Sequence, residues 1–275
     1  MLFILYGVFA EQSIAKLFIA AIIPGLISLM AYLIVIYIWV CLRPQDAPIP
    51  QEEISRGDRF NALRDCWAII LLFVVVVGGI YAGLFTPTEA AGVGAAATLV
   101  FGLLLGRLNL RLICDALKES VFQSSMIFVI AIGGKLFVNF IALTGLAQEI
   151  TQWINTSGVS VLAVMALIVV LYIFLGMFLD PIGIILLTLP LTIPIVETFG
   201  FSLIWFGVVV IKLLEIGLVT PPIGLNVFVI KSIVGDKISL EAIFGGVSWF
   251  LLAEIFVLAA ILTIPALSLF LTSFT

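Results

Sequence analysis

Two short stretches of this sequence combine proline with a polar residue inside long apolar segments. Asp180-Pro181 interrupts the apolar stretch 159–197, and Thr220-Pro221-Pro222 interrupts the stretch 203–230. Inside a membrane, backbone that leaves helical geometry must be buried in protein or line a cavity, because lipid offers no hydrogen bonds. Each break then leaves helix ends at membrane depth, where carbonyls can bind a cation and amides can hold a carboxylate. The two breaks are therefore the first candidates for a site.

The residue types at these breaks suit a sodium ion and an anionic solute. Asp180 is a good helix N-cap and a hard oxygen ligand, and Gly217 is placed to end the helix before the second break. By the same logic as at Asp180-Pro181, Thr220 is expected to cap a helix that begins at Pro221. Thr220 also offers a hydroxyl or a carbonyl, and Asn226 offers an amide. A structural interpretation stays open, because a TPP motif can be a simple kink and a lone Asp can simply cap its helix. Two proline-marked breaks, one of them carrying an acid, favour a transport site.

Five other charged residues lie in apolar segments. Lys212 and Glu215 are three residues apart on one helix face, which predicts a mutual salt bridge. Glu89 lies in the first turn of a predicted helix, where an acid favours the helix dipole. Lys135, beside two glycines, can contact an anionic substrate, neutralise a carboxylate or extend toward the headgroups. Glu254 faces a protein partner or a lipid headgroup, and both interpretations stay open.

The composition places the chain in a membrane. Of its 275 residues, 64% are hydrophobic and only 10% are charged, and the mean hydropathy is +1.37. So few charges cannot cover a water-soluble domain, so we expect a polytopic protein in contact with the lipid bilayer. No basic patch suits nucleic acid. The sequence has no histidine and no HExxH or GxSxG motif, which disfavours an intramembrane enzyme, and Cys41, Cys66 and Cys114 stand singly.

Hydropathy predicts an all-α fold with about six membrane crossings and one re-entrant hairpin. As one straight helix, residues 159–196 would be about 57 Å long, far more than a hydrocarbon core of ~30 Å. We therefore expect a hairpin over about 159–197 with its tip at Asp180-Pro181. Thr86 is expected to cap a helix that begins at Pro87. The predicted crossings are 18–42, 66–85, 88–106, 121–143, a broken helix over about 203–230, and 246–270, with surface helices at 107–118 (amphipathic) and 144–158 (interfacial).

Loop charges predict the orientation. The polar loop 43–65 carries four Arg, and segment 107–118 carries two Arg and one Lys, whereas segment 144–158 carries neither residue type. Lys and Arg are enriched in cytoplasmic loops. We therefore expect loop 43–65 to be cytoplasmic, the hairpin to open on the outer side, and the C-terminus to lie outside.

A weak internal similarity suggests two repeats of opposite orientation. ILYGVFAEQSIAKLFIAAIIPG (4–25) and FVIKSIVGDKISLEAIFGGVSW (228–249) share an order of features: a short apolar end, a polar turn, a surface segment and a long span. On the topology that the charges predict, the two copies run in opposite directions, as an inverted repeat would.

Three motifs in order resemble those of the large permease subunit, of the DctM type, of the tripartite ATP-independent periplasmic (TRAP) transporters. They are GLFTPTEAAGVGA (83–95), GMFLDPIGIILLTLPLTIPI (176–195) and EIGLVTPPIGLNVFVIKSI (215–233). The resemblance implies an elevator-type transporter of two inverted repeats in a bacterial inner membrane, with the C-terminus in the periplasm. It also implies that sodium, with no other cofactor, drives uptake of an organic acid. A periplasmic binding protein would deliver the acid, and a small membrane subunit of the DctQ type would brace the permease.

Carried over to this chain, the resemblance assigns residues and domains. A full subunit would have a first repeat with its own hairpin, so residues 1–42 are expected to be a remnant of that repeat, residues 43–65 a cytoplasmic loop, and residues 66–275 the second repeat. Either the chain is then a fragment of a longer gene product or a partner chain supplies the first repeat; the alternative function is that of a degenerate or truncated, non-transporting membrane protein. The residues expected to bind sodium are Asp180, Gly217, Thr220 and Gly224, and those expected to contact substrate are Pro181, Pro221, Pro222, Asn226 and Lys135.

Overall fold

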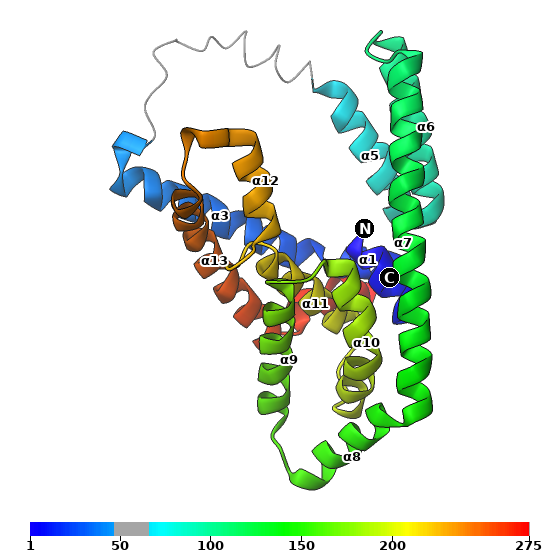
Figure 1. The fold of residues 1–275 in the computed structure, drawn as a ribbon, viewed down its shortest axis with the longest axis vertical. Helices are drawn as coiled ribbons and strands as arrows, with labels where there is room; N and C mark the ends of the chain where they lie inside the picture. Colours follow the sequence, from blue (N-terminus) through cyan, green and yellow to red (C-terminus); the bar gives the residue numbers. More distant parts are fainter. Residues whose placement is uncertain (47–65, 275) are drawn as a thin grey trace. The chain divides into compact units, whose positions relative to one another are not determined.

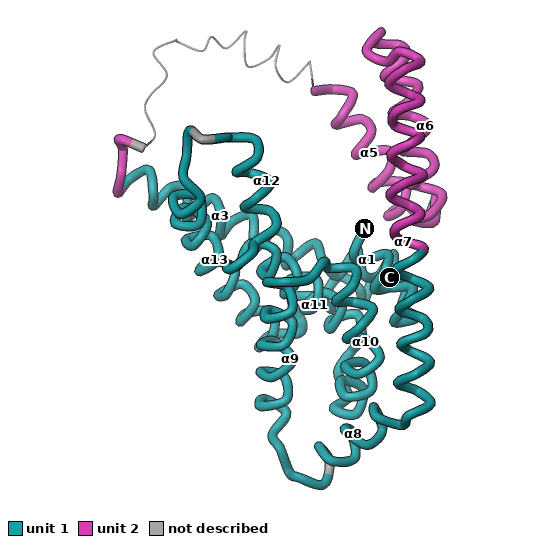
Figure 2. The backbone as a smooth tube through the Cα atoms, viewed as in Figure 1, with its two compact units in different colours: residues 1–41, 129–275 teal, residues 42–128 magenta. Residues whose placement is uncertain are grey.

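The computed structural model describes residues 1–46 and 66–274, and every regular element within them is helical, as predicted. Most of the polar loop 43–65 lies outside these residues. The chain forms two compact units, residues 1–41 with 129–275 and residues 42–128 (Figure 2). We describe each unit by itself.

The smaller unit contains α5 (Trp67–Tyr81), α6 (Pro87–Leu104) and the first part of α7 (Leu110–Thr144). The predicted cap of α6 is confirmed: Thr86 Oγ1 accepts a hydrogen bond from Glu89 N (3.3 Å), and Glu89 Oε2 accepts one from Thr86 N (2.8 Å). These two reciprocal bonds form a capping box, with Pro87 at the first helical position. Glu89 therefore has a structural role at the start of α6.

The two predicted surface helices have different outcomes. Residues 107–118 do not form a separate helix, because α7 runs without interruption from Leu110 to Thr144. Neither proline nor glycine separates the amphipathic segment from the apolar one, so nothing ends the helix between them. Residues 144–158 do form a helix, α8 (Leu146–Ser157), bounded by Gly145 and Gly158 at positive φ. Its place at the membrane surface stays a prediction.

The larger unit contains the remainder of α7 and most of the other helices (Figure 1). These are α1 (Leu2–Phe9), α2 (Ile14–Ala20), α3 (Ile22–Leu42), α8, α9 (Val161–Gly176), α10 (Pro181–Thr198), α11 (Leu203–Gly217), α12 (Leu225–Val234), α13 (Leu240–Thr263) and α14 (Ala266–Leu269). The short 3-10 helices of this unit are η2 (Gly235–Lys237) and η3 (Leu271–Phe274), whereas η1 (Pro44–Asp46) belongs to the smaller unit.

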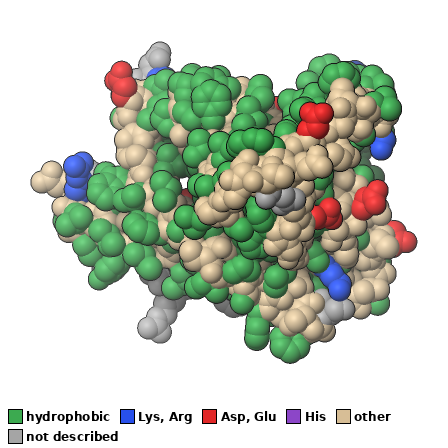
Figure 3. Space-filling model, turned by 90° about the horizontal axis from the view of Figure 1, so that it is seen from below, with side chains coloured by type: hydrophobic (Ala, Val, Ile, Leu, Met, Phe, Trp, Pro, Cys, Tyr) green, Lys and Arg blue, Asp and Glu red, His purple; other side chains and the backbone are tan. Residues whose placement is uncertain are grey.

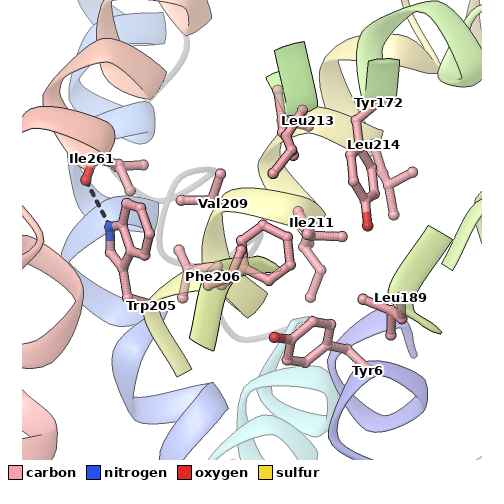
Figure 4. Close-up of a cluster of buried hydrophobic side chains, with 14 of the residues drawn as sticks. Tyr6, Tyr172, Leu189, Trp205, Phe206, Val209, Ile211, Leu213, Leu214 and Ile261 are labelled. Atoms are coloured by element: carbon pink, nitrogen blue, oxygen red, sulfur yellow. Dashed lines mark hydrogen bonds between the residues drawn. The ribbon is translucent and has the colours of Figure 1, made fainter. Parts of the chain in front are cut away.

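Helix α11 forms the centre of this unit. Apart from Lys212 and Glu215 its residues are apolar or glycine, which is the pattern of a helix buried on most sides. It contacts α1, α2, α9, α10, α13 and α14. Its Trp205 and Phe206 are fully enclosed in the buried cluster of Figure 4. Trp205 Nε1 donates to Ile261 O (2.9 Å), and Tyr6 Oη donates to Leu203 O (2.7 Å). The N-terminal helices are thus packed against the centre of the unit.

Helices α9 and α10 form an antiparallel pair joined by the short segment 177–180. Their buried contact is polar: Thr188 Oγ1 donates to Tyr172 Oη (2.7 Å), and Thr192 Oγ1 lies 3.3 Å from the same oxygen. The predicted helix–turn–helix over 159–197 is therefore present. Whether the pair enters and leaves the membrane on one side stays a prediction.

Within the described residues, five helices are long and apolar enough to cross a membrane: Ile14–Leu42 (counting α2 and α3 together), α6, α7, α10 and α13. Helices α5, α9 and α12 are apolar but shorter. Hydrophobic side chains cover large parts of the face seen in Figure 3.

The last span is shifted from the predicted 246–270, because α13 begins at Leu240 and ends at Thr263. Pro265 disfavours helical geometry at Ile264, which explains this end.

Candidate functional site

The first break lies between α9 and α10 and is a compact helix start. Asp180 is the N-cap of α10, and its Oδ2 accepts a hydrogen bond from Ile182 N (3.0 Å). Pro181 occupies the first helical position and is buried, whereas Asp180 is exposed. The predicted cap is confirmed. This hydrogen bond uses one carboxylate oxygen and leaves the other for a further partner.

The second break is longer than predicted. Helix α11 ends at Gly217, as expected, but the next helix does not begin at Pro221: α12 begins at Leu225, and Gly224 is its N-cap at φ +59°. Thr220 is therefore not an N-cap. A residue that precedes proline is disfavoured in the α region, so Pro221, which precedes Pro222, is an unfavourable first residue for a helix. The chain needs a left-handed residue to resume the helix, and glycine adopts that conformation at least cost.

Thr220 instead closes the end of α11. Its Oγ1 donates to Ile216 O (2.6 Å), and its amide donates to Ile216 O and Gly217 O (3.1 Å each). Asn226 N, beyond the break, donates to Leu218 O (3.2 Å). Among the described residues, no hydrogen bond reaches the carbonyls of Val219 and Thr220. The second break thus presents two carbonyl oxygens without donors.

A glycine contact brings the helix ends before the two breaks together. A Cβ atom on Gly176, at the end of α9, would lie 2.9 Å from Gly217 Cα, and one on Gly217 would lie 2.7 Å from Gly176 Cα. Real Cβ atoms do not approach this closely, so only glycine at both positions permits the contact. The prediction gave Gly217 a role in ending its helix and gave Gly176 none. The sequence did contain a signal for both residues, because a glycine lies about one helical turn before each proline motif.

The donor set around the breaks consists of hard oxygen atoms. Among the described residues, no group of three or more His, Cys, Asp or Glu side chains could hold a metal ion. The oxygen atoms at the breaks are the Asp180 carboxylate and backbone carbonyls, and such hard ligands suit a monovalent cation better than a transition metal. Gly224 is buried beside Phe244 and contributes only backbone.

Two of the predicted substrate residues, Lys135 and Asn226, line different cavities. Lys135 lines a cavity of about 460 Å³ with Glu11, Pro190 and Pro194. Asn226 lines a different cavity of about 550 Å³ beside α11 and α13. Pro221 and Pro222 are exposed, and Pro181 is buried. A substrate bound at the breaks beside Asn226 would therefore lie in a different cavity from Lys135.

The charged residues of α11 and α13 form one cluster. Lys212 Nζ lies 3.1 Å from Glu215 Oε2, so the predicted salt bridge is confirmed, and 3.0 Å from Glu254 Oε2. Glu254, whose partner the sequence left open, therefore faces Lys212 inside the protein. Lys212 and Glu254 are separated by 42 positions in sequence (254 − 212), so no local pattern could have paired them.

The family model described as "Tripartite ATP-independent periplasmic transporter, DctM component" matches residues 1–267. The chain belongs to this family. This match confirms the resemblance carried by the three motifs. The DctM family consists of transporter permeases and not of enzymes. The chain is therefore a multi-pass membrane protein, in agreement with its long apolar helices.

Three relatives of the DctM family illustrate how much of a permease the chain spans. The large permease SiaM of the sialic acid TRAP transporter of Vibrio cholerae is 32% identical over 98% of this chain and 62% of its own length. The C4-dicarboxylate permease DctM of Pseudomonas aeruginosa is 31% identical over 97% and 61%. The ectoine/5-hydroxyectoine permease UehC of Ruegeria pomeroyi is 30% identical over 98% and 62%. The chain thus spans about three fifths of these relatives.

Proposed function

We propose that the chain forms part of the large permease of a sodium-coupled secondary transporter that imports an organic acid. The observation that carries the proposal is the contact between Gly176 and Gly217, because it joins two helix ends, each followed by a proline-marked break. Helix breaks at membrane depth are where secondary transporters bind solutes and ions. Two of the three relatives named above transport acids by name, sialic acid and C4-dicarboxylates.

In this proposal the sodium ion is held by Asp180 together with backbone at Gly217, Thr220 and Gly224. The ion offsets the cost of placing a carboxylate in the membrane and fixes the two breaks against each other. Oxygens that support it are the second carboxylate oxygen of Asp180 and the carbonyls of Val219 and Thr220, which have no donors among the described residues.

The substrate carboxylate would lie at the N-terminal ends of α10 and α12, where backbone amides and the helix dipole favour an anion. Pro181 and Asn226 lie in the first turns of these two helices. Pro221 and Pro222 would line the same space, and Lys135 would attract the anion from its separate cavity. Because most of these contacts are backbone, the acid itself is not specified by side-chain chemistry.

The transporter that we propose works by an elevator motion of two inverted repeats, with residues 66–275 forming the second repeat. Further permease sequence, a small membrane subunit of the DctQ type and a periplasmic binding protein complete it. The family description calls the transporter "tripartite", which supports an assembly of several components. The assembly would lie in the inner membrane of a bacterium.

The test is uptake of labelled acids by proteoliposomes. The chain would be joined to the part of a relative's permease that it does not match, and supplied with the small subunit and the binding protein. An inward sodium gradient is expected to drive accumulation of at least one acid, and an equal potassium gradient is not. Equal uptake with both gradients would contradict sodium coupling, and no uptake of any acid by correctly inserted protein would favour a non-transporting role.

The orientation is part of the same proposal and has its own test. In a chain without native cysteines, Arg107→Cys should be shielded from an impermeant thiol reagent in intact cells, whereas Gln148→Cys should be labelled. Both side chains are exposed, so burial in the protein does not decide the result. Labelling of Arg107→Cys with protection of Gln148→Cys would reverse the topology.

A further inference from the structure

The cavity that contains Lys212, which we call the Lys212 pocket, adjoins the second break. It has a volume of about 550 Å³ and lies among α3, α11, α13 and the start of α12. Val219, in the break, and Asn226, in the first turn of α12, both line it. A solute whose carboxylate lies at the N-terminal end of α12 could therefore extend into the pocket with the rest of its chain.

The buried charges of the Lys212 pocket balance each other. Lys212 Nζ lies 3.0 Å from Glu254 Oε2, and the two side chains are 11% and 6% exposed. The second partner of Lys212 is Glu215, whose side chain is 55% exposed, so solvent screens its charge. The interior of the pocket is thus electrically neutral. An added charge would need a counter-charge that the pocket does not offer, so the lining favours an uncharged polar ligand group.

Two deeply buried side chains of the pocket keep unused hydrogen-bonding capacity. Ser28 and Glu254 are each 5% exposed. Among the described residues, neither Ser28 Oγ nor the Glu254 oxygens have a hydrogen-bond partner in good geometry, although Glu254 pairs with Lys212 by charge. Buried polar atoms are normally hydrogen-bonded, so these atoms indicate a missing partner.

The chemistry of the missing partner follows from the atoms that would meet it. A carboxylate only accepts hydrogen bonds, whereas the hydroxyls of Ser28 and Tyr32 can both donate and accept. Both of these side chains line the pocket, together with apolar residues such as Leu29 and Ile216. A ligand group that donates and accepts, carries no charge and is attached to carbon matches this lining, and an alcohol hydroxyl has all of these properties.

We propose that the Lys212 pocket binds the hydroxyl groups of the transported solute, which makes the substrate a hydroxylated carboxylic acid. This inference rests on the proposed function and adds the substrate class to it. The carboxylate of the acid lies at the start of α12, and its hydroxyl groups donate to Glu254 and accept from Ser28 and Tyr32. An acid without hydroxyl groups leaves these buried atoms unsatisfied and is therefore bound less tightly.

The test is equilibrium binding of acids to the purified full chain in lipid nanodiscs, measured by ligand-detected NMR titration. Each hydroxylated acid is paired with the acid that lacks its hydroxyl groups: L-malate with succinate, D-glycerate with propionate, and D-gluconate with hexanoate. Each pair shares its carboxylates and its carbon skeleton, so a difference in affinity reports the hydroxyl groups alone. We expect at least one hydroxylated acid to bind roughly tenfold or more tightly than its partner.

Two variants locate this binding in the Lys212 pocket. Ser28→Ala and Tyr32→Phe each remove one hydroxyl and keep every charge, and Tyr32→Phe also keeps the ring that packs on Phe250, with centroids 5.5 Å apart. Each variant should weaken binding of the hydroxylated acid about threefold to tenfold and leave binding of its partner unchanged. The matched controls are Ser268→Ala, a buried serine outside the pocket, and Tyr37→Phe, an exposed tyrosine on α3. Both controls should leave both affinities unchanged.

The inference is overturned if no hydroxylated acid binds more tightly than its partner, which includes the case in which the folded chain binds none of the acids. It is also overturned if Ser28→Ala and Tyr32→Phe both keep the full preference, because the pocket would then hold only water. Sodium-driven uptake by the complete transporter tests the proposed function separately. Uptake without a preference for hydroxyl groups removes this inference alone, and hydroxyl-dependent binding without sodium-driven uptake contradicts the transporter alone.

Discussion

The two proline-marked breaks look alike in sequence but differ in structure. At Asp180-Pro181 the chain turns within four residues and the next helix starts at the proline, because an N-cap precedes it. At Thr220-Pro221-Pro222 the prolines lie in the turn and the helix resumes only after Gly224. A single proline after a capping residue starts a helix, whereas a double proline postpones it. The first break is thus a helix start with a carboxylate, and the second is a backbone loop with free carbonyls.

The largest expected effect concerns the contact that joins the two breaks. Gly176→Val would force a side chain into Gly217 backbone and separate α9 from α11. We expect a loss of about 1–3 kcal/mol in the free energy of unfolding, as is typical of overpacked cores, measured by thermal unfolding in detergent. Gly183→Ala is the control, because a Cβ there meets no neighbour, and it should be neutral or stabilising. Equal stability of both variants would show that the close contact is not required.

The second break should depend on glycine in a way that the first does not. Gly224→Ala places a side chain at φ +59° and 3.0 Å from the Phe244 ring. The left-handed conformation alone costs roughly 1–2 kcal/mol for a residue with a Cβ. Hydrogen exchange should show faster opening at the start of α12. The matched control is Gly245→Ala, which is helical and meets no neighbour; similar exchange in both variants would contradict the assignment.

The smallest structural effect is expected at the first break. Asp180→Ala removes the cap of α10 and should cost about 1 kcal/mol, whereas Asp180→Asn keeps a capping oxygen and should cost much less. Thermal unfolding of the two variants, side by side, measures the difference. If Asp180→Asn is as unstable as Asp180→Ala, the carboxylate charge rather than the cap stabilises this helix start.

Features with local causes were predictable from the sequence. The caps at Thr86 and Asp180 and the end of α11 at Gly217 follow from residues within one helical turn. The continuity of α7 was missed because a polar segment suggested a boundary that no glycine or proline enforces. The late start of α12 was missed because capping rules for Asp-Pro were applied to Thr-Pro-Pro.

Features that depend on tertiary packing were not predictable. The partner of Glu254 and the contact of Gly176 with Gly217 join helices that are distant in sequence. The four residues predicted for the sodium site do lie at or beside the two breaks, because proline and glycine often mark helix ends in an apolar segment. Their binding of sodium stays a prediction.

The central claim is that Asp180 holds a sodium ion at the junction of the two breaks. Asp180→Asn preserves size and capping but removes the charge, so it tests the ion without removing the helix cap. Sodium titration of acid uptake by the complete transporter is the most direct measurement. The account predicts a higher sodium concentration for half-maximal uptake in Asp180→Asn, with the protein still inserted and folded. An unchanged sodium dependence would make Asp180 a helix cap only and contradict the claim.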